Sequence, residues 1–251
     1  MEVNGVVIVD KPRGITSFSV VSRVRRVFEK RSGRKVKVGH TGTLDPLASG
    51  VLVVMVGGET KRSKEMSGED KEYEVSCELG WATWTLDAWG EVKERWEVER
   101  EELMGLSLER VREVVVSLVG DWELPVPSYS AMKRRGRRLY ELARRGEMVR
   151  PRRLMEVKSA RLMSCKESDG ERYPEIVFRV EVGSGTYTRS LVEELGRRLG
   201  GVPAVQTNLV RLRVGNFKLS QSVDLEELER SSEPESYFIN NEIRRECQLQ
   251  G

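Results

Sequence analysis

The segment HTGTLDPLASG contains the only histidine of the chain, His40, and an aspartate five residues later, Asp45. On a rigid loop, Asp45 is a candidate catalytic carboxylate, and His40 beside it could contact a polar ligand. Such a carboxylate needs a cationic partner if it is to stay ionised in a desolvated pocket. The segment is therefore compatible with carboxylate chemistry on a glycine-rich loop.

Two other interpretations of this segment remain open from the residues alone. Asp45 precedes Pro46, and an aspartate before a proline can cap a short helix whose first position is the proline. A phosphate-binding loop is a further alternative, but the GxxxxGK[ST] pattern is absent and no lysine follows. Spacing by itself favours the helix cap, although that interpretation leaves His40 unexplained.

Basic residues are concentrated in two segments of a chain whose net charge is only +3. From Lys11 to Lys37, ten lysines and arginines accompany one acidic residue, and from Lys133 to Arg153 ten accompany two. Such segments suit a polyanion-binding face, because each neutralised phosphate releases condensed counterions. Either segment alone fits a solvated helix face equally well. Together, on both sides of the HTGTLDPLASG loop, they favour a nucleic-acid partner.

The length of 251 residues and the composition fit a soluble protein with one large domain, or with one domain and a small appendage. No apolar run is long enough to span a bilayer, and the N-terminus lacks the pattern of a secretory signal. The three cysteines lie far apart without a CxxC pair, so we expect reduced thiols in a cytoplasmic protein. One histidine and no paired cysteines argue against a transition-metal site.

The elements that would position the loop alternate between strands and single helices. GVVIVDKPRG predicts a short buried strand, and Thr16 or Ser17 can then cap a helix to about Lys30 that presents Phe18, Val21, Val24 and Val27 on one face. Further strands are predicted at VLVVMV, KEYEVSCELG, EIVFRVEVGSG and VQTNLVRLRVGNF. Further helices are predicted at SLERVREVVVSLVG, where Gly120 would end the helix, and at RRLYELARRG and TYTRSLVEELGRRLGG. This order favours an α+β or mixed α/β fold.

Six segments follow one another in a specific order: KPRGITS, VGHTGTLDPLASGVL, KEYEVSCELGWAT, VPSYSAMKRRGRRLYELARRG, GSGTYTRSL and LVRLRVGNF. Together they resemble the TruB family of tRNA pseudouridine synthases, which isomerise the T-loop uridine at tRNA position 55. The resemblance covers roughly residues 5–217, and its most specific part surrounds Asp45. It implies an α+β pseudouridine synthase-like domain with a mixed, largely antiparallel sheet flanked by helices and loops. It also implies tRNA as the partner, and no cofactor or metal.

The resemblance assigns the catalytic role to Asp45, which would act on the target uridine while its glycosidic bond is cleaved. Arg189 corresponds to the arginine that pairs with this aspartate, and it would supply the cation that a carboxylate in a dry pocket requires. Tyr73 corresponds to a tyrosine that packs against the target uracil, and Leu209 to an apolar residue on the other side of the base. Tyr187 is expected to shape the same pocket.

The resemblance also implies that the target uridine is extruded, because a base inside a folded T loop is inaccessible. His40 corresponds to a histidine that contacts the opened loop, where an imidazole can stack and hydrogen-bond without a permanent charge. Thr43, Lys11, Lys133 and Arg137 are further predicted RNA contacts. For Lys11 and the rest of KPRGITS, structural support of the catalytic loop is the favoured interpretation.

Four positions differ from the family pattern, namely Trp84, Thr188, Val210 and Leu212. None of them belongs to the set of Asp45, Arg189 and Tyr73. We assign residues 1–220 to the catalytic domain. We assign residues 221–251 to a peripheral acidic extension, too short for the RNA-binding PUA domain that many relatives carry.

Three alternatives stand beside a cofactor-free tRNA isomerase. An RNA-guided synthase of the dyskerin type shares the aspartate motif but depends on a PUA domain and partner proteins. An RNA chaperone without chemistry would have no need of Asp45, Arg189 and Tyr73. A domain with a mere Asp-Pro helix cap does not explain six ordered segments. For the favoured isomerase we expect a monomer, without membrane association or an obligate protein partner.

Overall fold

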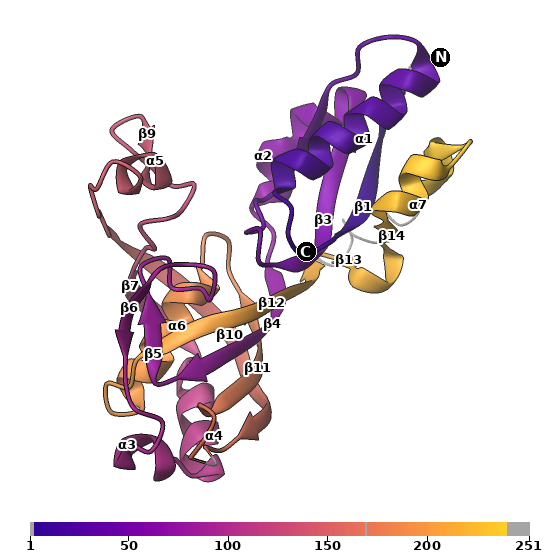
Figure 1. Ribbon diagram of the computed structural model, residues 1–251. Coiled ribbons are helices and arrows are strands. Elements are labelled where there is room, and N and C mark those ends of the chain that lie inside the picture. The colour runs from indigo at the N-terminus through magenta and orange to yellow at the C-terminus, as the bar shows by residue number, and fades with distance from the viewer. Residues whose placement is uncertain (1–2, 169, 240–251) are drawn as a thin grey trace. The chain divides into compact units, whose positions relative to one another are not determined.

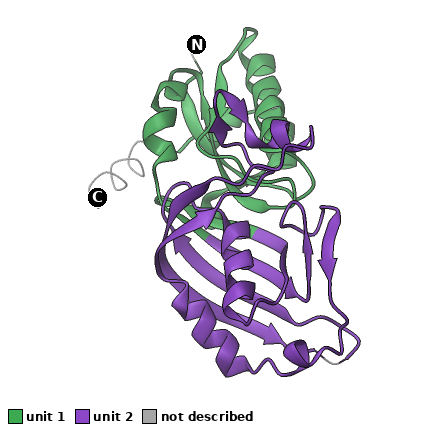
Figure 2. Cartoon of the chain, turned by 90° about the vertical axis from the view of Figure 1, so that its left-hand side faces the viewer, with its two compact units in different colours: residues 1–72, 210–251 green, residues 73–209 purple. Residues whose placement is uncertain are grey.

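The computed structural model describes residues 3–168 and 170–239. The chain divides into two compact units, of which the first comprises residues 1–72 and 210–251 and the second residues 73–209 (Figure 2). Among the described residues, no helix is both long and apolar enough to cross a membrane.

The first unit is built around two long antiparallel strands, β1 (Gly5–Lys11) and β3 (Ser49–Val56), which pair from Gly5 opposite Val56 to Lys11 opposite Gly50. Strand β14 (Val223–Asp224) pairs in parallel with β1. Strand β2 (Val38–His40) pairs with β3 in antiparallel orientation, and the end of β12 (Ala204–Val214) pairs with β3 in parallel orientation. The elements of this unit are β1 (Gly5–Lys11), α1 (Ser17–Ser32), β2 (Val38–His40), β3 (Ser49–Val56), η1 (Gly57–Arg62), α2 (Ser63–Ser67), β13 (Phe217–Lys218), η2 (Leu219–Gln221), β14 (Val223–Asp224), α7 (Leu225–Arg230) and η3 (Pro234–Tyr237).

Strands β1 and β3 are apolar at almost every position because both faces of their sheet are covered. Alternate residues of the two strands join one cluster with α1, which lies along the sheet (Figure 1), and with α7. The apolar residues between them, such as Ile8 and Val53, form a second cluster with α2 and β13 on the opposite face of the sheet. The continuous hydrophobic runs GVVIV and VLVVMV therefore encode a strand pair that is buried on both sides.

Helix α1 begins where the sequence predicts, because the Thr16 side chain accepts a hydrogen bond of 3.0 Å from the backbone N–H of Ser19. The predicted buried face is only partly right. Phe18 is 72% exposed, since it lies about 200° around the helix from Val20, which faces the sheet. The apolar residues that α1 buries are Val20, Val21, Val24 and Phe28.

The second unit contains a sheet in the order β12, β4, β11, β10, β7, with α4 packed against β10 and α6. Residues of β4 and β11 alternate between buried and half-buried, as the sequence predicts. The elements are β4 (Lys71–Leu79), β5 (Trp81–Thr83), β6 (Val92–Arg95), α3 (Glu101–Met104), α4 (Leu108–Ser117), β7 (Gly120–Pro125), β8 (Lys133–Arg134), β9 (Arg137–Arg138), α5 (Leu139–Ala143), β10 (Arg152–Lys166), β11 (Glu175–Val182), α6 (Thr188–Arg198) and β12 (Ala204–Val214).

The predicted α+β class with a mixed, largely antiparallel sheet is confirmed. One predicted helix end is wrong, because α4 stops at Ser117 and Gly120 already belongs to β7. With a φ of 122°, Gly120 adopts a conformation that favours glycine, but it does so at the start of a strand rather than at a helix cap. The long strand β10 and the hairpin β5–β6 were not predicted.

The acidic C-terminal segment is part of the first unit as far as residue 239. Val223 pairs with Val9 of β1, and Leu225 and Leu228 of α7 are buried in the same cluster as α1. These apolar residues complete a core shared with β1 and α1, and the division between residues 220 and 221 stays a prediction. The remainder of the predicted extension, residues 240–251, lies outside the described residues.

Candidate active site

The segment that carries Asp45 is a turn between β2 and β3. No helix begins at Pro46; the N–H of Ala48 instead donates to the Asp45 carbonyl at 3.0 Å, which closes a tight turn. The helix-cap interpretation is therefore wrong. His40 is the last residue of β2, so a paired strand fixes the position of its backbone.

The KPRGITS segment holds this turn through three backbone groups on the two residues beside Asp45. The Ser17 hydroxyl donates to the Leu44 carbonyl at 3.0 Å and accepts from the Leu44 N–H at 2.8 Å. The N–H of Gly14 donates to the Pro46 carbonyl at 2.8 Å. Because Ser17 is buried, its two bonds replace water that the Leu44 backbone cannot reach. Asp45 therefore lies between two anchored residues.

Lys11 is a third support of the turn. Its side chain is fully buried, and its Nζ donates to the carbonyls of Ala48 at 2.6 Å and Pro12 at 3.0 Å. Burial lowers the pKa of Lys11 to about 8, while the nearby Asp45 carboxylate opposes this shift. A fully buried amine with two carbonyl acceptors is placed to hold the loop, which disfavours the predicted contact between Lys11 and RNA.

Arg211 of β12 supports the turn from the other side. It is 1% exposed, its Nε donates to the Val51 carbonyl at 2.7 Å, and its Nη2 donates to the Gly42 carbonyl at 3.2 Å. Residue 50 must be glycine here, because a Cβ on Gly50 would lie 2.3 Å from the carbonyl oxygen of Arg211. No sequence motif pointed to Arg211, although this residue stands between two of the positions that differ from the family pattern, Val210 and Leu212.

Arg189 lies in the second unit near the start of α6, and it is buried rather than on the helix surface. Its guanidinium donates to the carbonyls of Thr85 at 2.8 Å and Tyr129 at 3.0 Å. It also forms an ion pair of 3.6 Å with Asp87, and only 4% of its side chain is exposed. Asp87 is thus an acidic partner of Arg189, and no sequence motif pointed to it.

Asp87 belongs to a turn with its own hydrogen bonds. Its Oδ1 accepts from the Thr85 hydroxyl at 3.0 Å and from the Trp89 N–H at 3.1 Å, and the N–H of Ala88 donates to Gln206 of β12 at 2.9 Å. The alternating polar residues of TWTLD were the available signal, since short polar side chains that bond neighbouring backbone groups are typical of turns. This turn fixes Asp87 against Arg189.

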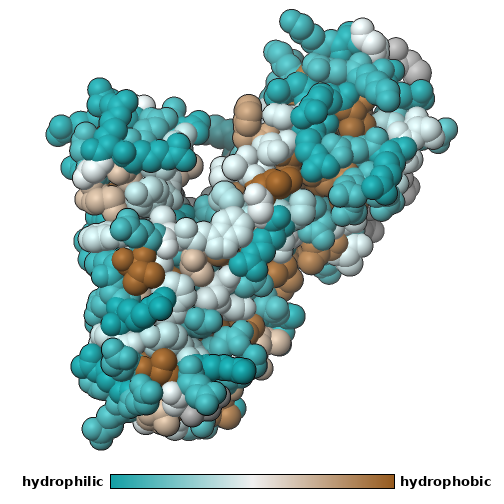
Figure 3. All heavy atoms as spheres, viewed as in Figure 1, coloured by the Kyte–Doolittle hydropathy of each residue, from teal (hydrophilic) through white to brown (hydrophobic). Residues whose placement is uncertain are grey.

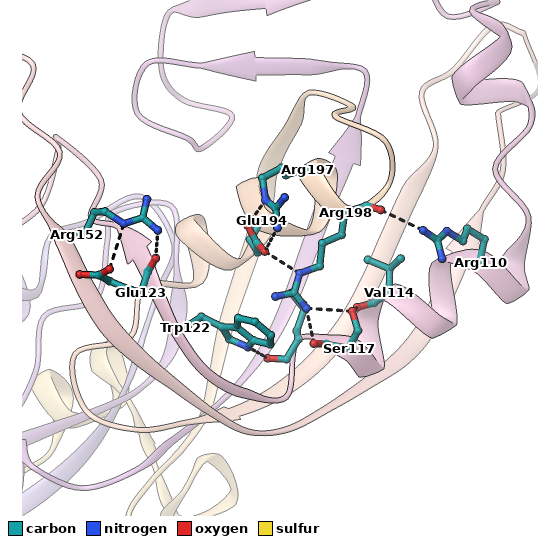
Figure 4. A network of polar contacts seen from close by, with 10 residues as sticks. Arg110, Val114, Ser117, Trp122, Glu123, Arg152, Glu194, Arg197 and Arg198 are labelled. Atoms are coloured by element: carbon teal, nitrogen blue, oxygen red, sulfur yellow. Dashed lines mark hydrogen bonds and ion pairs between the residues drawn. The ribbon is translucent and has the colours of Figure 1, made fainter.

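A second polar network holds the far end of α6 (Figure 4). Arg198 bonds Glu194 on its own helix at 2.7 Å and the Ser117 hydroxyl on α4 at 3.1 Å. Its guanidinium also lies 4.0 Å from the centre of the Trp122 ring on β7. The helix that carries Arg189 is therefore fixed to α4 and β7 at its other end.

The remaining predicted pocket residues lie in the second unit, with Tyr73 and Leu209 buried and Tyr187 half-buried as the N-cap residue of α6. Burial of this kind suits core packing as well as a base pocket, so their roles stay predictions. Asp45 belongs to the first unit, and its pairing with Arg189 of the second unit likewise stays a prediction.

The arginine-rich segment of the second unit is an exposed hairpin followed by a short helix. Lys133 pairs with Arg138 and Arg134 with Arg137, and the surface of this segment is almost uniformly hydrophilic (Figure 3). Leu139 anchors it, being 1% exposed. Lys133 and Arg137 are therefore accessible, as an RNA contact requires. The side chain of Thr43, in the segment before Asp45, is exposed as well.

The basic residues of α1 are less available than their number suggests. Arg23 forms a two-bond ion pair with Glu229 of α7, with 2.6 Å between its Nε and the carboxylate, and Arg31 lies 3.5 Å from Glu235. The acidic C-terminal segment thus neutralises part of the first basic segment. No group of three or more His, Cys, Asp or Glu residues that could hold a metal ion occurs among the described residues.

Comparison with known proteins identifies the fold and then the family. The protein is similar to a chain in the crystal structure of a Cbf5-Nop10-Gar1 complex, with a TM-score of 0.68, 26% identity, and coverage of 97% of this chain and 62% of that one. It is also similar to a chain in the crystal structure of the archaeal box H/ACA sRNP Nop10-Cbf5 complex, with a TM-score of 0.61, 25% identity, and coverage of 93% and 57%. The chain spans about three fifths of these solved chains. Its fold is that of the pseudouridine synthases.

Residues 25–188 match the family described as TruB family pseudouridylate synthase (N terminal domain). The tRNA pseudouridine synthase B of Bacillus cytotoxicus is 38% identical over 94% of this chain and 75% of that protein. The protein of the same name from Aquifex aeolicus is 37% identical, over 94% and 77%. The chain belongs to the TruB family of pseudouridylate synthases, which are isomerases, as the six ordered segments predict.

Proposed function

We propose that this chain converts the T-loop uridine at position 55 of tRNA into pseudouridine, with Asp45 as the catalytic carboxylate. Relatives of 37–38% identity that are named tRNA pseudouridine synthase B support the choice of substrate. The observation that carries the role of Asp45 is the anchoring of both neighbouring residues, Leu44 and Pro46, by the KPRGITS segment. A carboxylate that is held in position needs no reorganisation when charge develops on the substrate.

The reaction is an isomerisation in which the bond between N1 and C1′ of the target uridine breaks and a bond between C5 and C1′ forms. The hydrogen on C5 leaves as a proton, and N1 acquires one, so no oxidant or co-reactant is consumed. Asp45 acts on the nucleotide during cleavage, and Arg189 keeps the carboxylate charged. Tyr73 and Leu209 hold the uracil between them while it turns, and Tyr187 shapes the pocket.

Recognition of the tRNA is assigned to separate residues. His40 and Thr43 contact the opened T loop, from which the uridine is extruded into the pocket. Lys133 and Arg137 on the exposed hairpin contact phosphates of the T arm, and such contacts position the RNA without reading its sequence. The chain acts as a monomer in the cytoplasm, with neither a guide RNA nor a protein partner.

The test is the release of tritium from an unmodified tRNA transcript labelled at C5 of uridine. We expect release by the native chain alone, and none when the T-loop uridine is replaced by cytidine. Asp45→Asn should lower kcat by at least about 10³-fold, because it removes the charged carboxylate from the reaction and leaves the loop intact. Asp121→Asn is the matched control, since Asp121 is an exposed aspartate on β7.

An Asp45→Asn variant that still releases tritium at the native rate would overturn the assignment of this residue. If the native chain binds tRNA but releases no tritium, the proposed reaction is wrong for this substrate. Activity that appears only with a guide RNA or an added protein would instead favour the guided class. Sedimentation of the chain, alone and with tRNA, tests the expected monomer.

A further inference from the structure

His40 is connected to Arg211 through the backbone of Gly42. Arg211 donates from Nη2 to the Gly42 carbonyl at 3.2 Å, and the N–H of Gly42 donates to Nδ1 of His40 at 3.2 Å. All three residues belong to the first unit. Because a backbone N–H can only donate, Nδ1 of His40 must accept, and the ring proton of the neutral imidazole must lie on Nε2.

Arg211 is itself fixed, so it can impose this arrangement. Its side chain is 1% exposed, and its Nε donates to the Val51 carbonyl at 2.7 Å on β3. Its backbone pairs with Gly50 in the parallel ladder between β12 and β3. The planar guanidinium thus bonds a carbonyl on each side of the Asp45 turn, at Gly42 before it and at Val51 after it, which the single ammonium of a lysine could not do in the same geometry.

We propose that Arg211 is a positioning residue for His40. By holding the Gly42 carbonyl, it directs the Gly42 N–H onto Nδ1, so that His40 presents Nε2–H as a hydrogen-bond donor. The group that His40 recognises on its ligand is therefore an acceptor. That this ligand is the opened T loop rests on the proposed function, whereas the tautomer of His40 does not.

The charges around His40 agree with a neutral ring. Burial lowers the pKa of His40, and the positive charge of Arg211 lowers it further. Of the charged residues on α1, Arg25 reaches β2, where it donates to the Val38 carbonyl at 3.4 Å. The neighbouring η1 carries Glu59, Lys61 and Arg62, and β3 carries no charged residue. The charge that lowers the pKa of His40 is that of Arg211.

Since His40 is the only histidine, the test can observe it directly. Labelling with ¹⁵N-histidine gives one imidazole, whose two nitrogen shifts report the tautomer and whose titration reports the pKa. We expect the native ring to be neutral at pH 7 with its proton on Nε2. In Arg211→Met the pKa should rise and the preference for Nε2–H should weaken, because the charge and the bond to Gly42 are both lost.

Arg211→Lys separates the effect of the positive charge from that of the hydrogen bond to Gly42. It also replaces Arg211→Met in the test if that variant does not fold. It keeps the positive charge, so we expect a low pKa with a mixed tautomer and an increase of several-fold in KM for tRNA, with a smaller change in kcat. Arg213→Met is the matched control on the same strand. The Nη1 of Arg213 donates to the Gly215 carbonyl, outside the Asp45 turn, so its loss should leave the His40 spectrum unchanged.

The proposal is overturned if folded Arg211→Met, or Arg211→Lys where the former does not fold, keeps the native tautomer. It is also overturned if Arg213→Met alters the His40 spectrum as strongly. If the tautomer responds as expected while the native chain releases no tritium from tRNA, the positioning role stands and the proposed function fails. The two conclusions can therefore be separated.

Discussion

Around Asp45, the side chains that bond its loop are buried polar groups rather than exposed ones. Ser17, Lys11 and Arg211 each reach a backbone carbonyl of the segment from residue 42 to residue 51. A buried hydrogen bond of this kind contributes only about 1 kcal/mol net to the free energy of unfolding. Removing one partner costs more, because the other buried polar group is then left without a hydrogen bond. The geometry around Asp45 therefore depends on side chains that lie apart from it in the sequence.

Lys71 provides a residue-scale prediction on pH. Burial lowers its pKa to about 8, helped by the charge of Arg211. The folded chain therefore binds fewer protons than the unfolded chain between pH 8 and the ordinary lysine pKa of about 10.4. Burying the charge destabilises the fold below pH 8, so the free energy of unfolding should gain up to about 1.4 kcal/mol per pH unit from Lys71 as pH rises through this window.

Urea denaturation at pH 7, 8, 9 and 10 measures this effect. In Lys71→Met the rise of stability with pH should be smaller than in the native chain by the contribution of one lysine. Lys64→Met, at an exposed position of α2, should retain the native slope. Identical slopes for Lys71→Met and the native chain would contradict the lowered pKa.

At the scale of elements, local patterns located α1, α4, α5, α6 and the strands β1, β3, β4, β11 and β12, and contacts between elements decided which faces they bury. The period-two alternation of KEYEVSCEL matches β4 residue for residue, and Thr16 caps α1. Strand β10 escaped prediction because most of its residues are exposed, so its sequence lacks a regular apolar alternation. Its position follows from pairing with β7 and β11 on its two edges.

The turn that carries Asp87 gives an element-scale prediction for the second unit. Asp87→Asn should destabilise the chain by about 1–3 kcal/mol, because it removes the negative charge that lies 3.6 Å from the buried guanidinium of Arg189. Glu74→Gln, which removes a half-exposed ion pair with Arg179, should cost less than about 1 kcal/mol. Chemical denaturation measures the free energy of unfolding of both variants. Equal losses would show that the buried Asp87 pair stabilises the fold no more than the half-exposed Glu74 pair does.

At the scale of the whole molecule, the first unit is made from two segments that lie far apart in the chain, and the second unit is one continuous segment. The first unit combines residues 1–72 with residues 210–251, so the two ends of the sequence share one core. The same two segments also form ion pairs with each other, because acidic residues of the C-terminal segment pair with Arg23 and Arg31 of α1. Composition could show a basic and an acidic segment but not that they neutralise each other.

Leu228 tests whether the C-terminal segment is integral to the first unit. Its side chain is fully buried in the cluster with α1, so Leu228→Ala should destabilise the chain by about 2–5 kcal/mol through the cavity it leaves. Leu154→Ala is the control, since Leu154 is 65% exposed and should cost no more than about 0.5 kcal/mol. A peripheral C-terminal segment would instead make the two losses equal and small, as measured by thermal and urea unfolding.

The sequence by itself determined the family, the α+β class, the start of α1 and the segment that contains Asp45 and His40. These features depend on periodicity, capping and motif order, which are properties of neighbouring residues. The tertiary structure decided that Asp87 accompanies Arg189, that Arg211 reaches Gly42 and Val51, and that α7 closes the core over α1. Those contacts join residues 100 or more positions apart, as Arg211 and Val51 are at a separation of 160. Strand pairing and packing bring these residues together, and no local pattern in the sequence records which distant residue each of them meets.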